Sequence, residues 1–196
     1  KILKIRGEAM QNSVPKGEGG MIAVLGSTIK NIEKIIKENA DNFKAQIAND
    51  NSDGQIVLSG KIRDLEKLGN FLKENKIKNI KLPVSAPFHC SLMSHATKVM
   101  SEELNKLKFK KGSNALISNV TADEISNEDE LKDLLVKQIE SRVRWRESIS
   151  NMIDKEVDHF IEIGPGKVLS GLVKRINKEI TTNSVNNEDD IRNIKL

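Results

Sequence analysis

The segment PVSAPFHCSLM, residues 83 to 93, places His89 directly before Cys90, the only cysteine of the chain. An apolar run typical of a strand, residues 77 to 84, leads into this segment, and a run typical of a helix follows it. A junction from strand to helix exposes side chains at the end of a sheet, where α/β folds bind ligands. Because imidazole titrates near neutral pH, His89 is a candidate general base. The alternative is a partly buried structural histidine.

Cys90 is a second candidate, as a thiol nucleophile, because a thiolate needs a base nearby. Adjacent residues usually point their side chains apart, which favours Cys90 as a small buried hydrophobic residue. His95 lies on the next predicted helix, and the chain has neither a CxxC nor an HExxH pattern. The sequence therefore does not indicate a metal site.

Arg6 lies within a helical face that is otherwise apolar, formed by Ile2, Ile5, Ala9 and Met10. It is either a surface arginine or a fork that binds a carboxylate through two hydrogen bonds. The motif RGEAMQ alone does not decide between these roles. The opening KILKIRGEAMQ resembles the later part of an amphipathic helix, so we expect the chain to be a fragment.

The segment IEIGPGKVLSGL, residues 161 to 172, resembles a phosphate-binding loop in its glycines. A Walker loop needs GxxxxGK followed by Ser or Thr, whose hydroxyl binds Mg²⁺. Here Val168 follows Lys167, and the earlier glycine is missing. Gly164 and Gly166 therefore predict a turn between a strand and a helix.

Composition excludes several classes of function. Basic and acidic residues are interspersed, the net charge is +4 and only 3% of residues are aromatic, so no nucleic-acid surface is indicated. No run approaches the roughly 18 apolar residues of a membrane span, and no signal peptide is visible. A single cysteine suits a reducing compartment, and we expect a cytoplasmic protein.

Hydrophobic periodicity divides the chain into two parts. Residues 20 to 84 have the order βαββαβ, which predicts a ferredoxin-like subdomain. The predicted strands are 21–26, 43–50, 55–60 and 77–84, and the predicted helices are 27–40 and 61–76.

Residues 1 to 19 and 85 to 196 alternate between helix and strand, which predicts an α/β domain with a parallel sheet that is incomplete in this chain. The predicted strands are 115–120, 158–164 and 181–185, and the predicted helices are 91–107, 128–141, 144–156 and 166–178. The subdomain is predicted to be inserted in this domain.

A series of motifs covers almost the whole chain in a fixed order. They are RGEAMQ, GMIAVLG, NDNSDGQIVLSG, LPVSAPFHCSLM, SNVTA, VKQIESRVRWRESI and FIEIGPGKVLSGLVKRI. In this order the chain resembles malonyl-CoA:acyl carrier protein transacylases. It is also similar to the acyltransferase domains of fatty-acid and polyketide synthases.

The resemblance implies part of an α/β-hydrolase-like domain with a parallel sheet and the inserted ferredoxin-like subdomain. It also implies transfer of a malonyl group from malonyl-CoA to the phosphopantetheine thiol of acyl carrier protein in fatty-acid biosynthesis. Such a transfer proceeds through a serine ester, with a coenzyme A thioester as substrate and no metal or prosthetic group. The expected state is a monomer.

Each candidate residue takes its role from this resemblance. His89 matches the base that activates the serine, and Gln138 matches the residue whose main-chain carbonyl orients that base. Arg6 matches the arginine that pairs with the free carboxylate of the malonyl group. Met10 matches a residue that lines the acyl pocket. Phe88 is the residue type associated with specificity for malonyl rather than methylmalonyl groups. Asn119 matches a residue that supports the site without contacting the substrate.

One departure from the family is large. No GxSxG occurs in residues 1 to 196, and the family's early GQGSQ segment is absent too. We therefore expect the nucleophile to lie in a polypeptide segment that this chain lacks and that complements it. Two alternatives remain: an inactive remnant that folds and docks the acidic carrier protein, and a thiol enzyme that uses Cys90.

Overall fold

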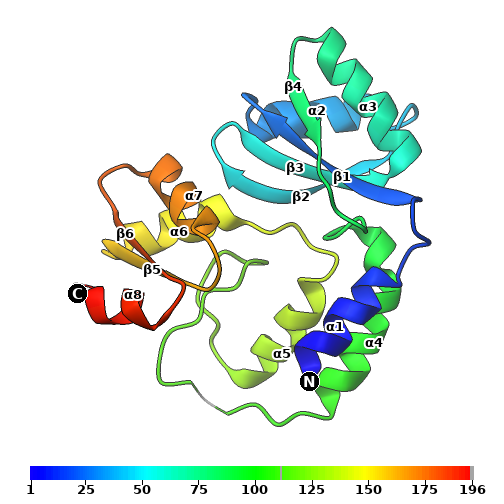
Figure 1. Cartoon of the computed structure of the whole chain (residues 1–196). Helices are drawn as coiled ribbons and strands as arrows, with labels where there is room; N and C mark the ends of the chain where they lie inside the picture. Colours follow the sequence, from blue (N-terminus) through cyan, green and yellow to red (C-terminus); the bar gives the residue numbers. More distant parts are fainter. Residues whose placement is uncertain (111, 195–196) are drawn as a thin grey trace.

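The computed structural model describes residues 1–110 and 112–194 (Figure 1). Within these ranges the chain has an α/β fold with three parts: a four-stranded antiparallel sheet with two helices, a group of three helices, and a two-stranded parallel sheet with its own helices. No helix in the described ranges has both the length and the apolar character that crossing a membrane requires.

The four-stranded sheet has the order β2-β3-β1-β4, and every neighbouring pair is antiparallel. Its strands and helices are β1 (Gly19–Leu25), α2 (Ile29–Glu38), β2 (Ala45–Ser52), β3 (Gln55–Lys61), α3 (Ile62–Glu74) and β4 (Lys78–Lys81). The tight turn between β2 and β3 requires Gly54, whose φ of 76° suits glycine. Thr28 begins α2 as its N-cap, because its hydroxyl accepts the N–H of Asn31.

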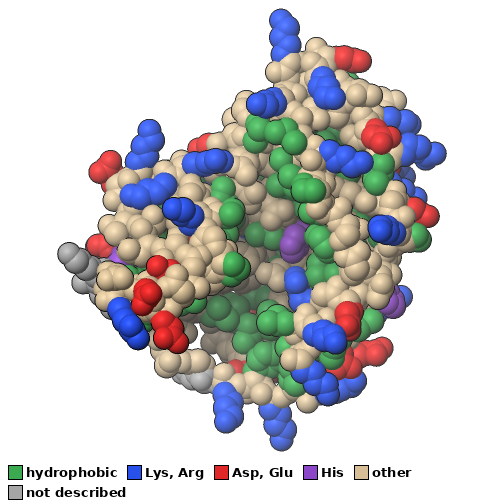
Figure 2. Space-filling model, viewed as in Figure 1, with side chains coloured by type: hydrophobic (Ala, Val, Ile, Leu, Met, Phe, Trp, Pro, Cys, Tyr) green, Lys and Arg blue, Asp and Glu red, His purple; other side chains and the backbone are tan. Residues whose placement is uncertain are grey.

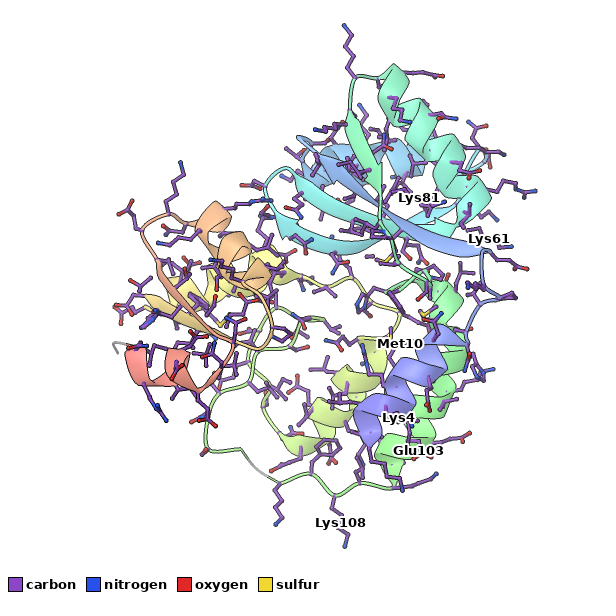
Figure 3. The ribbon with its side chains drawn as sticks, in the orientation of Figure 1. Lys4, Met10, Lys61, Lys81, Glu103 and Lys108 are labelled. Carbon is purple, nitrogen blue, oxygen red and sulfur yellow. The ribbon has the colours of Figure 1, made fainter. Side chains whose placement is uncertain are left out.

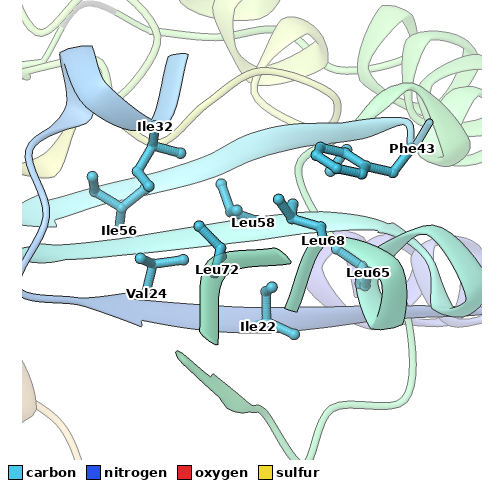
Figure 4. Packing of buried hydrophobic residues seen from close by; sticks show 10 residues of the cluster. Ile22, Val24, Ile32, Phe43, Ile56, Leu58, Leu65, Leu68 and Leu72 are labelled. Atoms are coloured by element: carbon cyan, nitrogen blue, oxygen red, sulfur yellow. The ribbon is translucent and has the colours of Figure 1, made fainter. Parts of the chain in front are cut away.

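The two faces of this sheet have different neighbours because side chains alternate along each strand. On one face, residues from β1 and β3 pack against both helices in the largest apolar cluster (Figure 4). Its buried members are Ile22, Val24, Ile32, Phe43, Ala45, Ile56, Leu58, Leu65, Leu68 and Leu72. On the other face, Met21, Ala48 and Val57 pack against Leu82 and Phe88. The second face therefore lies over the segment that carries His89.

The helical group consists of α1 (Ile2–Gln11), α4 (Ser94–Asn105) and α5 (Glu128–Lys137), with a 3₁₀ turn, η1 (Ser91–Met93), before α4. Helices α1, α4 and α5 lie side by side (Figure 1). Small and flexible side chains fill the space between them, including Ala9, Met10, Ala96 and Met100.

The C-terminal part contains α6 (Trp145–Asp154), β5 (His159–Ile163), α7 (Val168–Ile176), β6 (Thr181–Val185) and α8 (Glu188–Asn193). Strands β5 and β6 are parallel. Ile149 of α6, Val173 of α7 and Ile180 form the buried centre of this part.

The prediction of a strand at residues 115–120 is wrong. Only an isolated antiparallel bridge joins Ile117 to Glu124, because the chain reverses between them. The reversal is held by Ser118, whose N–H donates to the carbonyl of Asp123 over 2.9 Å and whose own carbonyl accepts the N–H of Ala122 over 2.8 Å. The parallel sheet of the described residues consequently has two strands, β5 and β6, rather than the three that the alternation predicted.

Leu58 is fully buried at the centre of the largest apolar cluster, so Leu58→Ala is expected to lower the free energy of unfolding by about 2–5 kcal/mol. The matched control is Leu3→Ala, because Leu3 is 79% exposed and its truncation should change stability by less than about 0.5 kcal/mol. Urea denaturation followed by circular dichroism measures both variants. Equal stability of the two would contradict the central role of this cluster.

Candidate active site

His89 lies in the irregular segment between β4 and η1, and its φ of 57° is in the left-handed region. This conformation is uncommon for residues other than glycine, so the surrounding contacts must hold it. The thiol of Cys90 donates to the carbonyl of Pro87 over 3.1 Å, and the N–H of Ser91 donates to the side-chain oxygen of Gln46 over 2.7 Å. These two bonds fix the chain on the C-terminal side of His89.

The ring of His89 is bonded to the end of a helix. Its Nδ1 lies 2.9 Å from the main-chain carbonyl oxygen of Gln138, which directly follows α5. The last carbonyls of a helix have no partner within the helix and lie at the negative end of its dipole. Because a carbonyl only accepts, Nδ1 carries the proton, and Nε2 of the neutral ring has a free lone pair. This tautomer is the one that a general base requires.

The side chain of Gln138 joins two more of the predicted site residues. Its Oε1 accepts from Nη2 of Arg6 over 3.3 Å, and its Nε2 donates to Oδ1 of Asn119 over 2.9 Å. The structure therefore brings His89, Gln138, Arg6 and Asn119 into one hydrogen-bonded chain, in which Gln138 contributes both its backbone and its side chain.

Arg6 is partly buried, and this burial lowers the pKa of its guanidinium. Among residues 1–110 and 112–194, no carboxylate forms an ion pair with it. A cation withdrawn from water without an acidic partner is costly, and a carboxylate-bearing ligand would compensate that cost.

Met10 and Phe88 supply the apolar surroundings. Met10, near the end of α1 that adjoins the four-stranded sheet, is buried with only 4% of its surface exposed (Figure 3). Phe88 packs against the apolar cluster of the helical group. It also packs against the second face of the four-stranded sheet, where Met21, Ala48 and Val57 lie. Both residues therefore belong to the apolar packing next to Arg6 and His89.

A cavity of about 600 Å³ adjoins His89. Its lining includes Gln46 and Ile47 of β2, Val120, and the charged side chains of Arg142 and Arg144. Figure 2 shows a hollow on the face seen in Figure 1, with hydrophobic side chains, a histidine and a basic side chain in its walls.

The environment of Cys90 does not suit a nucleophile. Its side chain is 1% exposed, and burial raises the pKa of the thiol, so the reactive thiolate is disfavoured. Within the described ranges, no group of His, Cys, Asp and Glu is arranged to hold a metal ion.

The glycine turn before α7 also has a structural explanation. Gly164 and Gly166 have φ values of 140° and 89°, which only glycine adopts readily. The carboxylate of Glu162 accepts the N–H groups of Leu169 and Ser170 over 3.1 and 2.8 Å. A side chain of the protein therefore occupies the start of α7, where a Walker loop would hold phosphate.

Sequence reasoning missed the contribution of residues 142–146, which follow α5 and include the first two residues of α6. Arg142, Arg144 and Arg146 of this segment form ion pairs with Glu33, Glu147 and Asp50. The signal was the alternation of arginines in SRVRWRES, which is typical of an extended segment, but the positions of the acidic partners could not be derived from it.

Known proteins resemble this chain over almost its whole length. It is 42% identical over 188 residues to the malonyl CoA-acyl carrier protein transacylase of Bacillus subtilis strain 168, covering 95% of this chain and 59% of the relative. The crystal structure of the malonyl CoA-acyl carrier protein transacylase from Clostridium perfringens superposes with a TM-score of 0.93 at 42% identity, over 97% of this chain and 60% of that one.

A third similar structure is that of a protein complex. It is a type II PKS acyl-carrier protein in complex with its malonyl-transacylase, with a TM-score of 0.92 at 31% identity, over 97% of this chain and 62% of that one. No family model matches the chain.

These comparisons show that the chain is similar in sequence and in α/β fold to transacylases. More narrowly, the similar proteins are named malonyl CoA-acyl carrier protein transacylases, which confirms the resemblance predicted from the motifs. The chain spans about 60% of the length of the relatives it matches.

The pKa of His89 lies below its ordinary value of 6.5, because burial outweighs the opposing effect of the Gln138 carbonyl and the positive charge of Arg6 acts in the same direction as burial. Protonation of His89 therefore favours the unfolded state. The stability associated with the neutral ring is fully present above pH 6.5 and is lost as the pH falls through the folded pKa.

We expect the free energy of unfolding to fall more steeply between about pH 7 and pH 5 in the parent than in His89→Gln, which cannot titrate. Urea denaturation across this range measures the difference. An NMR titration of the imidazole protons gives the midpoint directly, and a His89 midpoint at or above 6.5 would contradict the burial argument.

Proposed function

We propose that this chain supplies the base, its orienting carbonyl and the carboxylate-binding arginine of a malonyltransferase. The enzyme would move a malonyl group from malonyl-CoA to the phosphopantetheine thiol of acyl carrier protein in fatty-acid biosynthesis. The observation that carries the proposal is the bond of 2.9 Å between Nδ1 of His89 and the carbonyl of Gln138, beside an arginine that has no acidic partner among the described residues. The names of the similar proteins support the same reaction.

The proposed reaction has two acyl transfers. A serine from polypeptide outside residues 1–196 gives its proton to Nε2 of His89 and attacks the thioester carbonyl of malonyl-CoA. The carbon–sulfur bond breaks, His89 returns the proton to the departing coenzyme A thiolate, and the malonyl group remains as a serine ester. The carrier protein's thiol then gives its proton to His89 and attacks this ester, and the proton returns to the serine.

The geometry of Gln138 supports the role of His89 in both transfers. Each time the ring accepts a proton, Nδ1–H remains bonded to the Gln138 carbonyl, whose partial negative charge stabilises the imidazolium. In a Ser-His-Asp triad an aspartate does this work. A neutral carbonyl stabilises the cation less than a carboxylate does, so it raises the pKa of His89 by less than burial lowers it.

In the proposed complex Arg6 binds the free carboxylate of the malonyl group, which provides the acidic partner that the described residues do not offer. Met10 and Phe88 line the short acyl chain, and Asn119 holds the side chain of Gln138 in place. Because Gln138 contacts both Arg6 and His89, its position sets the distance between carboxylate recognition and proton transfer.

We further propose that residues 20–84 are a ferredoxin-like subdomain inserted into an α/β-hydrolase-like domain formed by residues 1–19 and 85–196. The strand order β2-β3-β1-β4 supports the first part. The parallel pair β5 and β6 supports the second, together with apolar side chains that remain exposed there: Ile161, Ile163, Val168 and Leu169. Further polypeptide that carries the serine would cover these side chains, in a cytoplasmic enzyme that acts as a monomer.

The decisive experiment uses radiolabelled malonyl-CoA. The purified chain alone should retain no label after denaturing electrophoresis, because none of its serines lies on a GxSxG elbow. A fusion that places a GHSxGE-bearing N-terminal segment of the family before residue 1 should become labelled at its elbow serine. In this fusion, His89→Ala should lower transfer to carrier protein by roughly 10²–10⁴-fold.

Two results would contradict this proposal. Stoichiometric label on the chain alone, at Ser91 or Cys90, would support an enzyme with its own nucleophile. A folded fusion that never becomes labelled but binds carrier protein would support the alternative of a non-catalytic remnant, which the absence of GxSxG motivates.

Arg6→Ala in the fusion should impair malonyl transfer and spare acetyl transfer, because acetyl-CoA has no carboxylate to bind. Loss of a desolvated charged partner costs about 2–5 kcal/mol, which corresponds to a loss of roughly 30-fold or more in kcat/KM for malonyl-CoA. Lys4→Ala is the control, because Lys4 lies on the same helix with its side chain 80% exposed (Figure 3). Equal losses for both acyl groups would show that Arg6 acts in folding.

A further inference from the structure

Strand β2 supports both halves of the hydrogen bond between His89 and Gln138. On the His89 side, the side chain of Gln46 on β2 accepts the N–H of Ser91, as described above. On the Gln138 side, residues 142–146 lie against the same strand. The N–H of Val143 donates to the carbonyl of Ala48 over 2.7 Å, and the N–H of Asp50 donates to the carbonyl of Val143 over 3.0 Å.

An ion pair between Arg146 and Asp50 restrains the contact between residues 142–146 and β2. Nε and Nη2 of Arg146 donate to the carboxylate oxygens of Asp50 over 2.8 to 3.2 Å, in a two-pronged geometry. Asp50 is only 1% exposed, whereas Asp53, at 3.7 Å from Arg146, is 91% exposed. An ion pair with a buried carboxylate contributes little to net stability, because removing Asp50 from water offsets the attraction of the partly exposed Arg146. Its specific geometry does, however, favour one arrangement of the two segments over others.

The segment also holds the neighbours of Gln138. The N–H of Arg144 donates to the carbonyl of Asn119 over 3.0 Å, and the guanidinium of Arg144 donates to the carbonyl of Thr121 over 2.8 Å. Asn119 in turn accepts from the side chain of Gln138. Two of the restraints on Gln138, the chain that follows it and its bond to Asn119, therefore lead to residues 142–146 and from there to Asp50.

We propose that Asp50 and Arg146 are positioning residues, which hold the carbonyl of Gln138 against Nδ1 of His89 by anchoring residues 142–146 to β2. This role rests on the proposed function, because it assigns positioning residues to the same site. Neither residue lines the cavity beside His89, so their effect passes through Gln138. A purely structural pair would affect unfolding without affecting the His89 ring.

The test compares two double variants with equal charge changes. Asp50→Asn with Arg146→Gln removes the buried pair and keeps the net charge. Asp123→Asn with Lys155→Gln does the same to an exposed pair, 2.9 Å apart, that joins the end of α6 to the turn at residues 118–123. The measurement is an NMR titration of the imidazole protons of His89 in this chain, with His95 and His159 as internal references.

We expect the His89 pKa in the Asp50/Arg146 variant to fall by about half a unit or more, because the ring loses the carbonyl that stabilises its protonated form while it remains buried. The Asp123/Lys155 variant should leave the His89 pKa at the parent value. Arg146→Lys, which keeps the charge but not the two-pronged geometry, should give an intermediate value. In the fusion enzyme the Asp50/Arg146 variant should lower kcat about tenfold and leave KM for malonyl-CoA within about twofold.

An unchanged or raised His89 pKa in the folded Asp50/Arg146 variant, or an equal fall in both double variants, would overturn the proposal. If the Asp50/Arg146 variant does not fold, the titration of Arg146→Lys decides in the same way. The titration needs no acyl transfer. A parent fusion that transfers no malonyl group would therefore contradict the proposed function while the shift of the His89 pKa still tested the positioning role.

Discussion

The candidate site depends on one main-chain carbonyl, directly after a helix, that no backbone N–H of the helix can reach. Helix α5 stops at Lys137, and the Gln138 carbonyl directly after it accepts from Nδ1 of His89. If the helix continued, this oxygen would be used by the backbone four residues later, and the ring would lose its acceptor. The predicted helix, 128–141, was longer than the observed one, and the earlier end leaves this carbonyl free to accept from His89.

The site is assembled from segments that are distant in sequence. The bonds that meet at Gln138 span 132 residues to Arg6, 49 to His89 and 19 to Asn119. Closing such loops costs chain entropy before the contacts repay it. The candidate site therefore forms only when the helical group and the four-stranded sheet have both folded, and local unfolding of either part would separate His89 from Gln138.

The sequence predicted the elements that depend on local patterns. The hydrophobic periodicity of residues 20 to 84 led to the order βαββαβ, and this order of elements is observed. Residues 115–120 were misread because a strand-like composition does not reveal that Ser118 closes a turn. Helix α8 was missed because its apolar content is small and it begins only through the cap at Asn187.

The site itself was predicted unevenly. His89, Gln138, Arg6 and Asn119 came from motifs matched to a family, and the structure brings them together, but no periodicity would have selected Gln138 for its backbone oxygen. The pair of Asp50 and Arg146 could not have been found, because 96 residues separate its members and each resembles an ordinary surface charge. Long-range pairing of polar groups depends on the complete fold, which local sequence patterns do not encode.

The parallel pair β5 and β6 has a consequence for how the chain behaves in concentrated solution. Both strands are edges of a two-stranded sheet. Ile163, the last residue of β5, is 83% exposed, and Val168, the first residue of α7, is 71% exposed. Open edges flanked by apolar side chains are templates for pairing between copies of a chain. Isolated molecules should therefore aggregate through this end, and colloidal stability, rather than folding, should limit the concentration at which the chain can be handled.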